Sequence, residues 1–337
     1  MRKGMASMID GVILLDKPEG ISSQKAVTMV KHACHADKAG HTGTLDPLAT
    51  GLLAVCLGEA TKFSQDLFNA DKTYITTVFF GVKTETGDAE GKVIARGNVN
   101  FNSENETEVD MQLNGLIPRF MGKIKQVPPM YSAIKKDGKP LYAYAREGEM
   151  FDLEAREVTI SHLRWVSMTW PFAVLEIKCS KGTYIRSLVS DMGEALGCGA
   201  HLTALRRTQV GHLKIAQAQT HEAIEQQAKI MAVDSLIEHL PQLVLDEHMS
   251  LRIRNGQRIL VSDLNQSEQN LEGQIVKIYY SEVNPQFFMG IVEVRQGVMH
   301  PKRLLATSRL DLVLQKVLSS NLVTDTSMKH DVNSLFH

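Results

Sequence analysis

The stretch that most constrains this chain is residues 40–53, which read GHTGTLDPLATGLL. Three glycines, three threonines and one proline in fourteen residues exclude a regular helix or a central strand, so we expect a tight loop. Pro47 disfavours the helical backbone region for the residue before it, so the carboxylate of Asp46 projects from a stiff turn. An apolar segment, residues 52–57, follows directly.

Two interpretations of this loop are open on its spacing alone. A lone carboxylate on a rigid loop, with His41 five residues upstream, is typical of a nucleophile or general base beside a recognition group. Alternatively, Asp46-Pro47 is an ordinary turn in which Thr44 hydrogen-bonds to nearby backbone.

Five further stretches decide between them. They are residues 16–23, 72–74, 127–133, 181–188 and 201–207. Together with the loop they resemble motifs of the TruB family of tRNA pseudouridine synthases, in the family's order. Several independent motifs in the right order, spread over about two thirds of the chain, are a specific signal, whereas any one alone would be weak.

The resemblance implies that the chain isomerises the T-loop uridine of tRNA, at position 55 in tRNA numbering, to pseudouridine, with Asp46 as catalytic nucleophile. Such a site needs an anionic oxygen, a cation beside it and an apolar or aromatic pocket that retains the detached uracil. Arg186 is the expected cation, because an arginine stays charged and can pair with a carboxylate through two nitrogens. By resemblance Tyr74 stacks on the uracil, Tyr184 is a second contact, and Leu205 is the opposite wall.

The route of the reaction stays open at this point. Asp46 could attack C6 of the base or C1′ of the ribose, or could start a glycal route. The Tyr74 hydroxyl could help to move the C5 proton, so we count Tyr74 with the catalytic residues.

His41 has a separate role by resemblance. A uridine stacked in a folded RNA loop must be turned outward, which costs a few kcal/mol, and the His41 ring would fill the vacated stack. A zinc site is the alternative interpretation of four nearby side chains, His32, Cys34, His35 and His41. However, no second ligand pair has zinc-finger spacing, and the reaction needs no metal. We therefore expect no metal and no other cofactor.

Charge is distributed unevenly along the chain. The net charge of −1 argues against a general nucleic-acid coat. Residues 119–146 nevertheless carry seven basic side chains and one acidic, a composition that fits either RNA phosphates or a solvated loop. The residues expected to contact RNA are all basic: Lys17, Lys123, Lys125, Lys135, Lys136, Arg206 and Arg207.

The length of 337 residues suggests more than one domain. We expect an α/β catalytic domain over residues 1–240, with the pseudouridine synthase fold, a mixed, largely antiparallel sheet and an RNA-binding insertion at about 121–150. A PUA-like RNA-binding domain, β-rich and implied by the resemblance, would occupy residues 241–314, and residues 315–337 would be a disordered tail.

Local patterns predict individual elements within this plan. Strands are expected at residues 73–82, 158–166, 172–179, 204–210, 258–261, 274–280 and 287–294, and helices at 108–120, 184–196 and 221–239. Residues 84–106 are rich in Gly, Asn and acidic side chains and predict a mobile excursion, whereas residues 123–148 predict irregular backbone.

Several classes are excluded or disfavoured. No apolar run reaches the ~18 residues of a membrane helix, and residues 1–11 lack the apolar core of a signal peptide. The four cysteines show no paired spacing and predict free thiols in the cytoplasm. The glycine-rich loop lacks the Gly-Lys-Ser/Thr ending of a nucleotide triphosphatase. We expect a monomer whose partner is tRNA, bound at its T arm and acceptor end.

Two rival functions stay open. The chain could be mainly an RNA-binding or tRNA-folding factor whose isomerase activity is secondary. It could also be a pseudouridine synthase that acts on another RNA.

Overall fold

The computed structural model describes residues 9–97, 106–264, 271–281, 286–309 and 311, and it divides into two compact units. The first contains Ile13–Leu57 and Ser64–Ile230. The second contains Asp10–Val12, Gly58–Phe63 and the chain from residue 231 onward, so it begins before residue 241 and includes two short N-terminal segments. The tail predicted over residues 315–337 lies outside the described residues.

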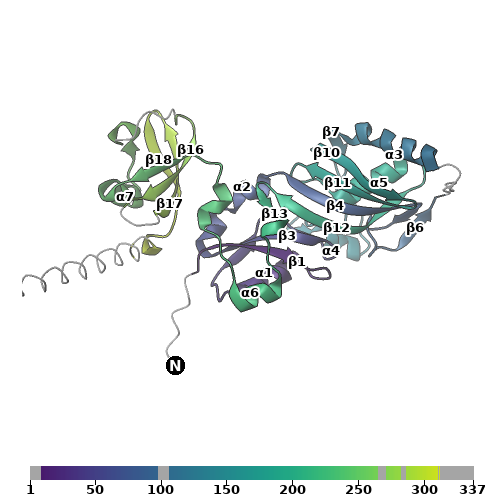
Figure 1. Cartoon of the computed structure of the whole chain (residues 1–337), viewed down its shortest axis with the longest axis horizontal. Helices are drawn as coiled ribbons and strands as arrows, with labels where there is room; N and C mark the ends of the chain where they lie inside the picture. The colour runs from purple at the N-terminus through teal and green to yellow at the C-terminus, as the bar shows by residue number, and fades with distance from the viewer. Residues whose placement is uncertain (1–8, 98–105, 265–270, 282–285, 310, 312–337) are drawn as a thin grey trace, which may run out of the picture. The chain divides into compact units, whose positions relative to one another are not determined.

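A nine-stranded sheet forms the frame of the first unit (Figure 1). Its strand order is β1-β3-β12-β4-β11-β10-β7, with β2 beside β3 and β13 beside β12. The strands are β1 (Gly11–Lys17), β2 (Ala39–His41), β3 (Thr50–Leu57), β4 (Lys72–Phe80), β7 (Gly122–Gln126), β10 (Arg156–Thr169), β11 (Phe172–Cys179), β12 (Ala200–Val210) and β13 (Leu213–Lys214). Strands β3 and β12 pair in parallel, and the pairs from β12 across to β7 are antiparallel. The expected mixed, largely antiparallel sheet is confirmed.

Helices α3 (Glu106–Phe120) and α5 (Ile185–Ala195) lie on one face of this sheet (Figure 1). Alternate residues of β4 are buried on that face, as period-2 patterning requires. They pack with Leu188, Val189 and Met192 of α5 in a single core. The other helical segments of the first unit are α1 (Ser23–Ala33), α2 (Ser64–Asn69), α4 (Leu141–Arg146), η2 (Ile215–Gln217) and α6 (His221–Gln227). The segments η1 (Gly58–Phe63) and η3 (Val233–Ile237) belong to the second unit.

Two predicted segments differ from the structure. The helix expected over residues 221–239 ends with α6 at Gln227. The backbone of Ala228 is extended, and the side chain of Gln219 binds both the backbone N and the backbone O of Lys229. The excursion expected over residues 84–106 contains a hairpin of β5 (Val82–Thr84) and β6 (Val93–Arg96) in its described part. A buried residue within it, Asp88, forms a bridge with Leu202 of β12.

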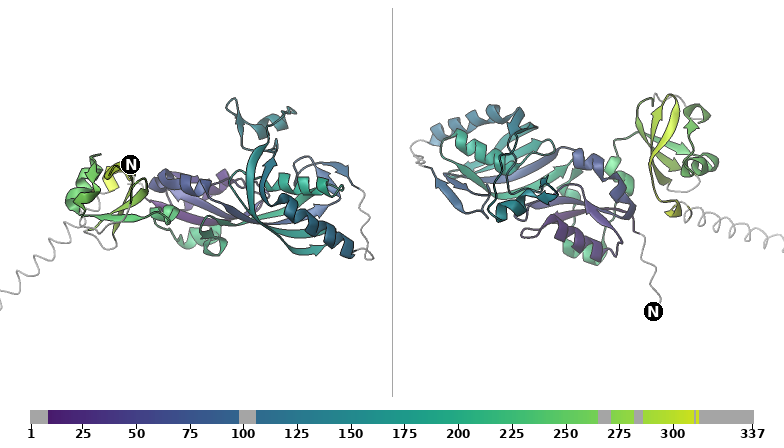
Figure 2. Two further views of the ribbon diagram at one scale, coloured as in Figure 1. Left: turned by 90° about the horizontal axis from the view of Figure 1, so that it is seen from above. Right: turned by 180° about the vertical axis from the view of Figure 1, so that it is seen from behind.

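The insertion between β7 and β10 projects from the first unit (Figure 2). It contains β8 (Lys135–Lys136), β9 (Lys139–Pro140) and α4, packed around a small core of its own. Met130, Leu141 and Ala145 are the buried members of that core. The irregular backbone expected over residues 123–148 is present at residues 127–134, whereas β7, β8, β9 and α4 are regular elements. The apolar residues of the insertion are spaced too widely in the sequence to indicate its core.

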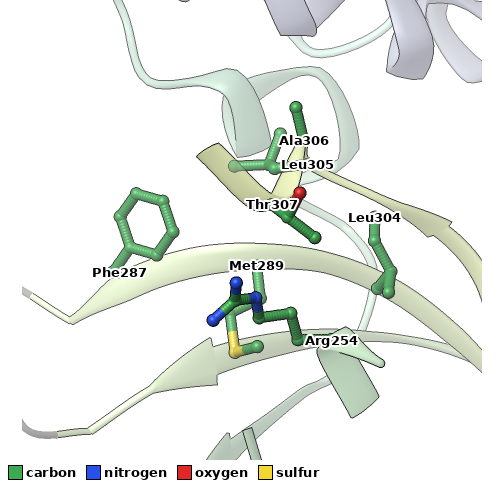
Figure 3. Close-up of a pocket in the computed structure, with 7 residues that line it drawn as sticks. All are labelled: Arg254, Phe287, Met289, Leu304, Leu305, Ala306 and Thr307. Carbon is green, nitrogen blue, oxygen red and sulfur yellow. The ribbon is translucent and has the colours of Figure 1, made fainter. Parts of the chain in front are cut away.

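The second unit contains a five-stranded sheet in the order β14-β16-β17-β18-β15. Its elements are β14 (Gln242–Leu245), α7 (Glu247–Arg254), β15 (Ile259–Leu260), η4 (Val261–Asp263), β16 (Ile275–Tyr280), β17 (Phe287–Arg295) and β18 (Val298–Leu304). The predicted β-rich module is confirmed, although β14 and β18 were not predicted. Figure 3 shows a pocket of this unit, lined by Arg254, Phe287, Met289 and residues 304–307, and none of the predicted site residues lines it.

Helix α5 carries an unfavourable charge that gives a testable pH dependence. Burial, and then the nearby negative charge of Glu194, raise the pKa of Asp191 to about 6, against the opposing effect of Lys83. A carboxyl whose pKa rises on folding lowers the free energy of unfolding as pH increases from about 4 to about 6. We expect Asp191→Asn to raise Tm at pH 7.5 by about 3 °C and to leave it nearly unchanged at pH 4. An equal gain at both pH values in thermal scans would contradict this origin.

In the part of the chain that the structure describes, no helix is both long and apolar enough to cross a membrane. Nor do any three His, Cys, Asp or Glu side chains among those residues gather as metal ligands. All four cysteines are buried free thiols, as predicted.

Candidate active site

Asp46 lies on the loop between β2 and β3, and the backbone on each side of it is held by residues of the 16–23 motif. On one side, Ser23 Oγ accepts from Leu45 N at 2.7 Å and donates to Leu45 O at 2.9 Å. On the other, Gly20 N donates to Pro47 O at 2.9 Å. The motif therefore fixes the position of the Asp46 carboxylate.

Lys17 belongs to the same support and is fully buried. Its ammonium donates to the carbonyl oxygens of Pro18, Ile21 and Pro47, at 2.8, 2.8 and 3.3 Å. Burial lowers the pKa of Lys17 to about 8, while the charge of Asp46 acts the other way. The expected phosphate contact of Lys17 is therefore wrong for this structure, because no part of the side chain reaches the surface.

Replacing this lysine tests its supporting role. Lys17→Met removes the donor of Pro18 O and Ile21 O and leaves Pro47 O with Gly20 N alone, so we expect the free energy of unfolding to fall by about 2 kcal/mol. Urea unfolding of Lys17→Met measures this, with Lys25→Met on the exposed surface of α1 as the matched control. Equal stabilities of the two variants would show that the buried ammonium does not hold the loop.

Arg207 of β12 also supports the loop and is 1% exposed. It donates to the carbonyl oxygens of Leu52, Gly43 and Thr44, at 2.8, 3.0 and 3.3 Å. Strand β3 approaches this arginine closely, since a Cβ atom on Gly51 would lie 2.3 Å from Arg207 O. The prediction that Arg207 contacts RNA is therefore wrong as well: its guanidinium binds the protein's own backbone.

The structure brings Asp46 and Arg186 together, with Arg186 Nη2 3.0 Å from Asp46 Oδ2. The Asp46 side chain is 40% exposed, whereas that of Arg186 is 6% exposed. One partner is thus open to a substrate while the other is fixed in the protein. The guanidinium also donates to Thr86 O at 2.9 Å and Tyr131 O at 2.7 Å, which fixes its plane.

A second carboxylate beside Arg186 was not predicted. Asp88 is buried, and its Oδ2 lies 3.7 Å from Arg186 Nε. Thr86 Oγ1 and Glu90 N donate to its other oxygen, at 2.5 and 3.1 Å. Only the glycine-rich turn around it was visible in the sequence, and that turn was interpreted as mobile.

Two residues of the predicted base pocket lie on the paired strands β4 and β12. Leu205 lies opposite Thr76, and Arg207 lies opposite Tyr74, so Tyr74 and Leu205 share the buried face of the sheet. Burial is the main cause that raises the pKa of both Tyr74 and Tyr184, and the negative charge of Asp46 contributes in both. The same carboxylate therefore acts on both phenols.

His41 ends β2, half-buried, and its Nδ1 accepts from Gly43 N at 3.2 Å. Burial, followed by the positive charge of Arg207, lowers the pKa of His41. The ring is therefore a neutral planar group at pH 7.

The other basic candidates lie on the surface. Lys123, Lys125, Lys135 and Lys136 are exposed, on β7 and on the insertion. Lys123 pairs with Glu157 at 3.0 Å, and Lys136 Nζ lies 3.6 Å from the centre of the Phe151 ring.

Arg206 is separated from this site by the sheet. It lies opposite Ile75, so it projects from the other face of β12 than Leu205 and Arg207. There it forms a two-bond ion pair with Asp16, at 2.7 and 3.0 Å. Its predicted RNA contact would therefore lie outside the site.

Comparison with protein families covers most of the chain. Residues 31–185 match the model of the TruB family pseudouridylate synthase N-terminal domain. Residues 186–249 match the tRNA pseudouridylate synthase B C-terminal domain, and residues 241–305 match the C-terminal model of pseudouridine synthase II TruB.

Individual relatives agree with the family models. The chain is 47% identical over 305 residues to a tRNA pseudouridine synthase B of Burkholderia mallei (strain NCTC 10247), covering 89% of this chain and 98% of the relative. It is 47% identical over 306 residues to one of Cupriavidus pinatubonensis, covering 88% and 94%. Among solved structures, a chain from the crystal structure of a Cbf5-Nop10-Gar1 complex aligns with a TM-score of 0.60 at 25% identity, covering 85% of this chain and 78% of that one.

Proposed function

The chain belongs to the TruB family of pseudouridylate synthases, and from that premise we propose that it converts the T-loop uridine of tRNA, position 55, to pseudouridine with Asp46 as nucleophile. The single observation that carries the proposal is the Asp46–Arg186 pair, 3.0 Å apart, with the carboxylate open and the guanidinium buried. The names of the relatives supply the substrate class.

The reaction is an isomerisation and needs no co-reactant. The bond between C1′ of the ribose and N1 of uracil breaks, the base turns, and C1′ bonds to C5, which loses its hydrogen as N1 gains one. Asp46 acts at C1′ or at C6, or starts a glycal route, and each route uses the same anionic oxygen. Arg186 fixes that oxygen through the ion pair, while the Asp46 side chain stays 40% exposed.

The detached uracil must be retained while it turns. Tyr74 and Leu205 share one face of the sheet, and Tyr184 begins the helix that carries Arg186. We assign the stacking contact to Tyr74, the second base contact to Tyr184 and the apolar wall to Leu205. These groups leave the base free to rotate, because aromatic and apolar contacts impose little in-plane direction.

The uridine reaches Asp46 only after it leaves its stack, and we assign His41 to the vacated space. Its neutral ring at the end of β2 suits stacking between bases. Four exposed lysines would position the T arm through its phosphates, which carry no sequence information: Lys123, Lys125, Lys135 and Lys136.

We further propose that the second unit is the PUA-like RNA-binding domain, which extends contact toward the acceptor end of tRNA. Its five-stranded sheet supports this assignment. We expect the protein to act in the cytoplasm as a monomer.

Mapping the product tests the proposal and separates it from the two rival functions. A purified unmodified tRNA transcript is incubated with the chain, and pseudouridine is located by chemical marking and primer extension. We expect one new pseudouridine, at position 55, and none in a transcript with cytidine there. Modification elsewhere would indicate another RNA target, and tight binding without modification would indicate a folding factor.

A further inference from the structure

The root of the insertion is joined to the helix that carries Arg186 by the side chain of Gln126. This residue ends β7, lies opposite Arg156 of β10 and is 2% exposed. Its Nε2 donates to Tyr184 O at 3.0 Å, and its Oε1 accepts from Tyr184 N at 2.8 Å. One amide thus binds both polar backbone groups of one residue of the base pocket.

The position of Tyr184 makes this contact consequential. Tyr184 is the N-cap residue of α5, with an extended backbone, and its side chain does not cap the helix. Its carbonyl accepts the first helical bond, from Leu188 N at 3.1 Å, as well as the bond from Gln126. Holding this peptide plane fixes both the direction of the phenol and the start of the helix two residues before Arg186.

Two more contacts join the same segments. Ser187 Oγ donates to Val127 O at 3.1 Å, and Arg186 Nη2 donates to Tyr131 O at 2.7 Å. Both come from side chains of α5 and reach the backbone of the insertion. The contact of Gln126 runs the other way, from the root of the insertion to the backbone of α5, so it acts on the helix itself.

We propose that Gln126 is a positioning residue for the isomerisation: through the backbone of Tyr184 it sets Tyr184 against the base and Arg186 against Asp46. The proposal rests on the proposed function. A shift of about 1 Å at a reacting centre can cost about 10²-fold in rate. Loss of this contact should therefore reduce the chemical step much more than tRNA affinity.

The chain offers a matched control for the chemistry of the contact. The side chain of Gln219 makes the same pair of hydrogen bonds to the backbone of a single residue, Lys229. It donates to Lys229 O at 2.9 Å and accepts from Lys229 N at 2.8 Å. This second contact holds the segment after α6 and includes none of the site residues. Gln126→Leu and Gln219→Leu therefore remove equivalent bonds with different expected consequences.

The experiment measures single-turnover release of the C5 hydrogen from tRNA labelled there, together with tRNA Kd and Tm. We expect Gln126→Leu to slow turnover about 30-fold with Kd within about 2-fold of the original chain, and Gln219→Leu to leave both unchanged. A folded Gln126→Leu with the original rate, or an equal loss in both variants, would overturn the proposal. Inactivity of the original chain would contradict the proposed function instead.

Gln126→Glu keeps the proposal testable if the leucine variant fails to fold. Its carboxylate cannot donate to Tyr184 O, whereas the protonated acid can, and burial favours the protonated form. The rate relative to the original chain should rise at least ~5-fold from pH 8 to pH 5.5. The charged groups near Tyr184, namely Arg156, Asp46 and Arg186, are the same in both chains, so the ratio reports the change at residue 126. A ratio that does not change with pH would overturn the proposal.

Discussion

Asp46→Asn is expected to abolish pseudouridine formation while tRNA binding stays nearly unchanged. The amide keeps the shape of the side chain and can still accept from Arg186 Nη2, but it lacks the anionic oxygen that every route requires. We expect the single-turnover rate of C5 hydrogen release to fall by about 10⁴-fold or more. The tRNA Kd from filter binding should stay within about 2-fold, because phosphate contacts dominate affinity.

Asp16→Asn is the matched control for this variant. Asp16 also pairs with an arginine, Arg206, but that pair lies on the other side of β12 from Leu205 and Arg207. The control should retain the original turnover. If Asp46→Asn lost tRNA affinity along with activity, Asp46 would be a structural residue of the loop, and the ordinary-turn interpretation would be correct.

Arg186→Lys is expected to produce the second large loss. A lysine carries the same charge but has a single nitrogen. It cannot replace the planar guanidinium in its simultaneous contacts with Asp46, Thr86 O and Tyr131 O. We expect kcat to fall by about 10³-fold with little change in KM, because the side chain of the arginine is only 6% exposed. Separate measurement of kcat and KM distinguishes this from weakened binding.

Asp88→Asn provides the comparison for the arginine variant. Asp88 contacts Arg186 on its Nε side, at 3.7 Å, and does not contact Asp46 in the structure. Its replacement should slow turnover less than Arg186→Lys does. An Arg186→Lys enzyme within about 10-fold of the original kcat would show that a point charge suffices, and that the plane of the guanidinium has no role.

The sequence was most informative where chemistry requires a particular residue on a particular loop. The predicted residues come from four separate motifs, with Tyr184 and Arg186 in the same one. The structure places Arg186, Tyr184 and Tyr74 near Asp46, and Leu205 on the face of the sheet that carries Tyr74. Their roles remain predictions, but their proximity follows from the strand order that the motifs occupy.

Basic residues in the same motifs were harder to interpret. Lys17 and Arg207 resemble phosphate ligands by charge alone, yet each satisfies three backbone carbonyl oxygens around the Asp46 loop. A tight, buried loop leaves such oxygens without partners, so buried cations are a physical consequence of its shape. The sequence shows the charge but not the burial.

Asp88 and Gln126 were missed for a related reason. Each is polar and lies in a stretch without apolar periodicity, so local patterns predict exposure. Both are buried by contacts with α5, from parts of the chain far from it in sequence. Only the tertiary fold reveals that such a residue has a specific partner.

A crystal structure of the Asp46→Asn chain bound to a T-arm hairpin would test the central claim most directly. We predict that the target uridine lies outside the RNA stack, between Tyr74 and Leu205, with its C1′ or C6 about 3–3.5 Å from the side chain of residue 46. His41 should occupy the vacated position. A uridine still stacked in its loop, or one bound away from residue 46, would contradict the account.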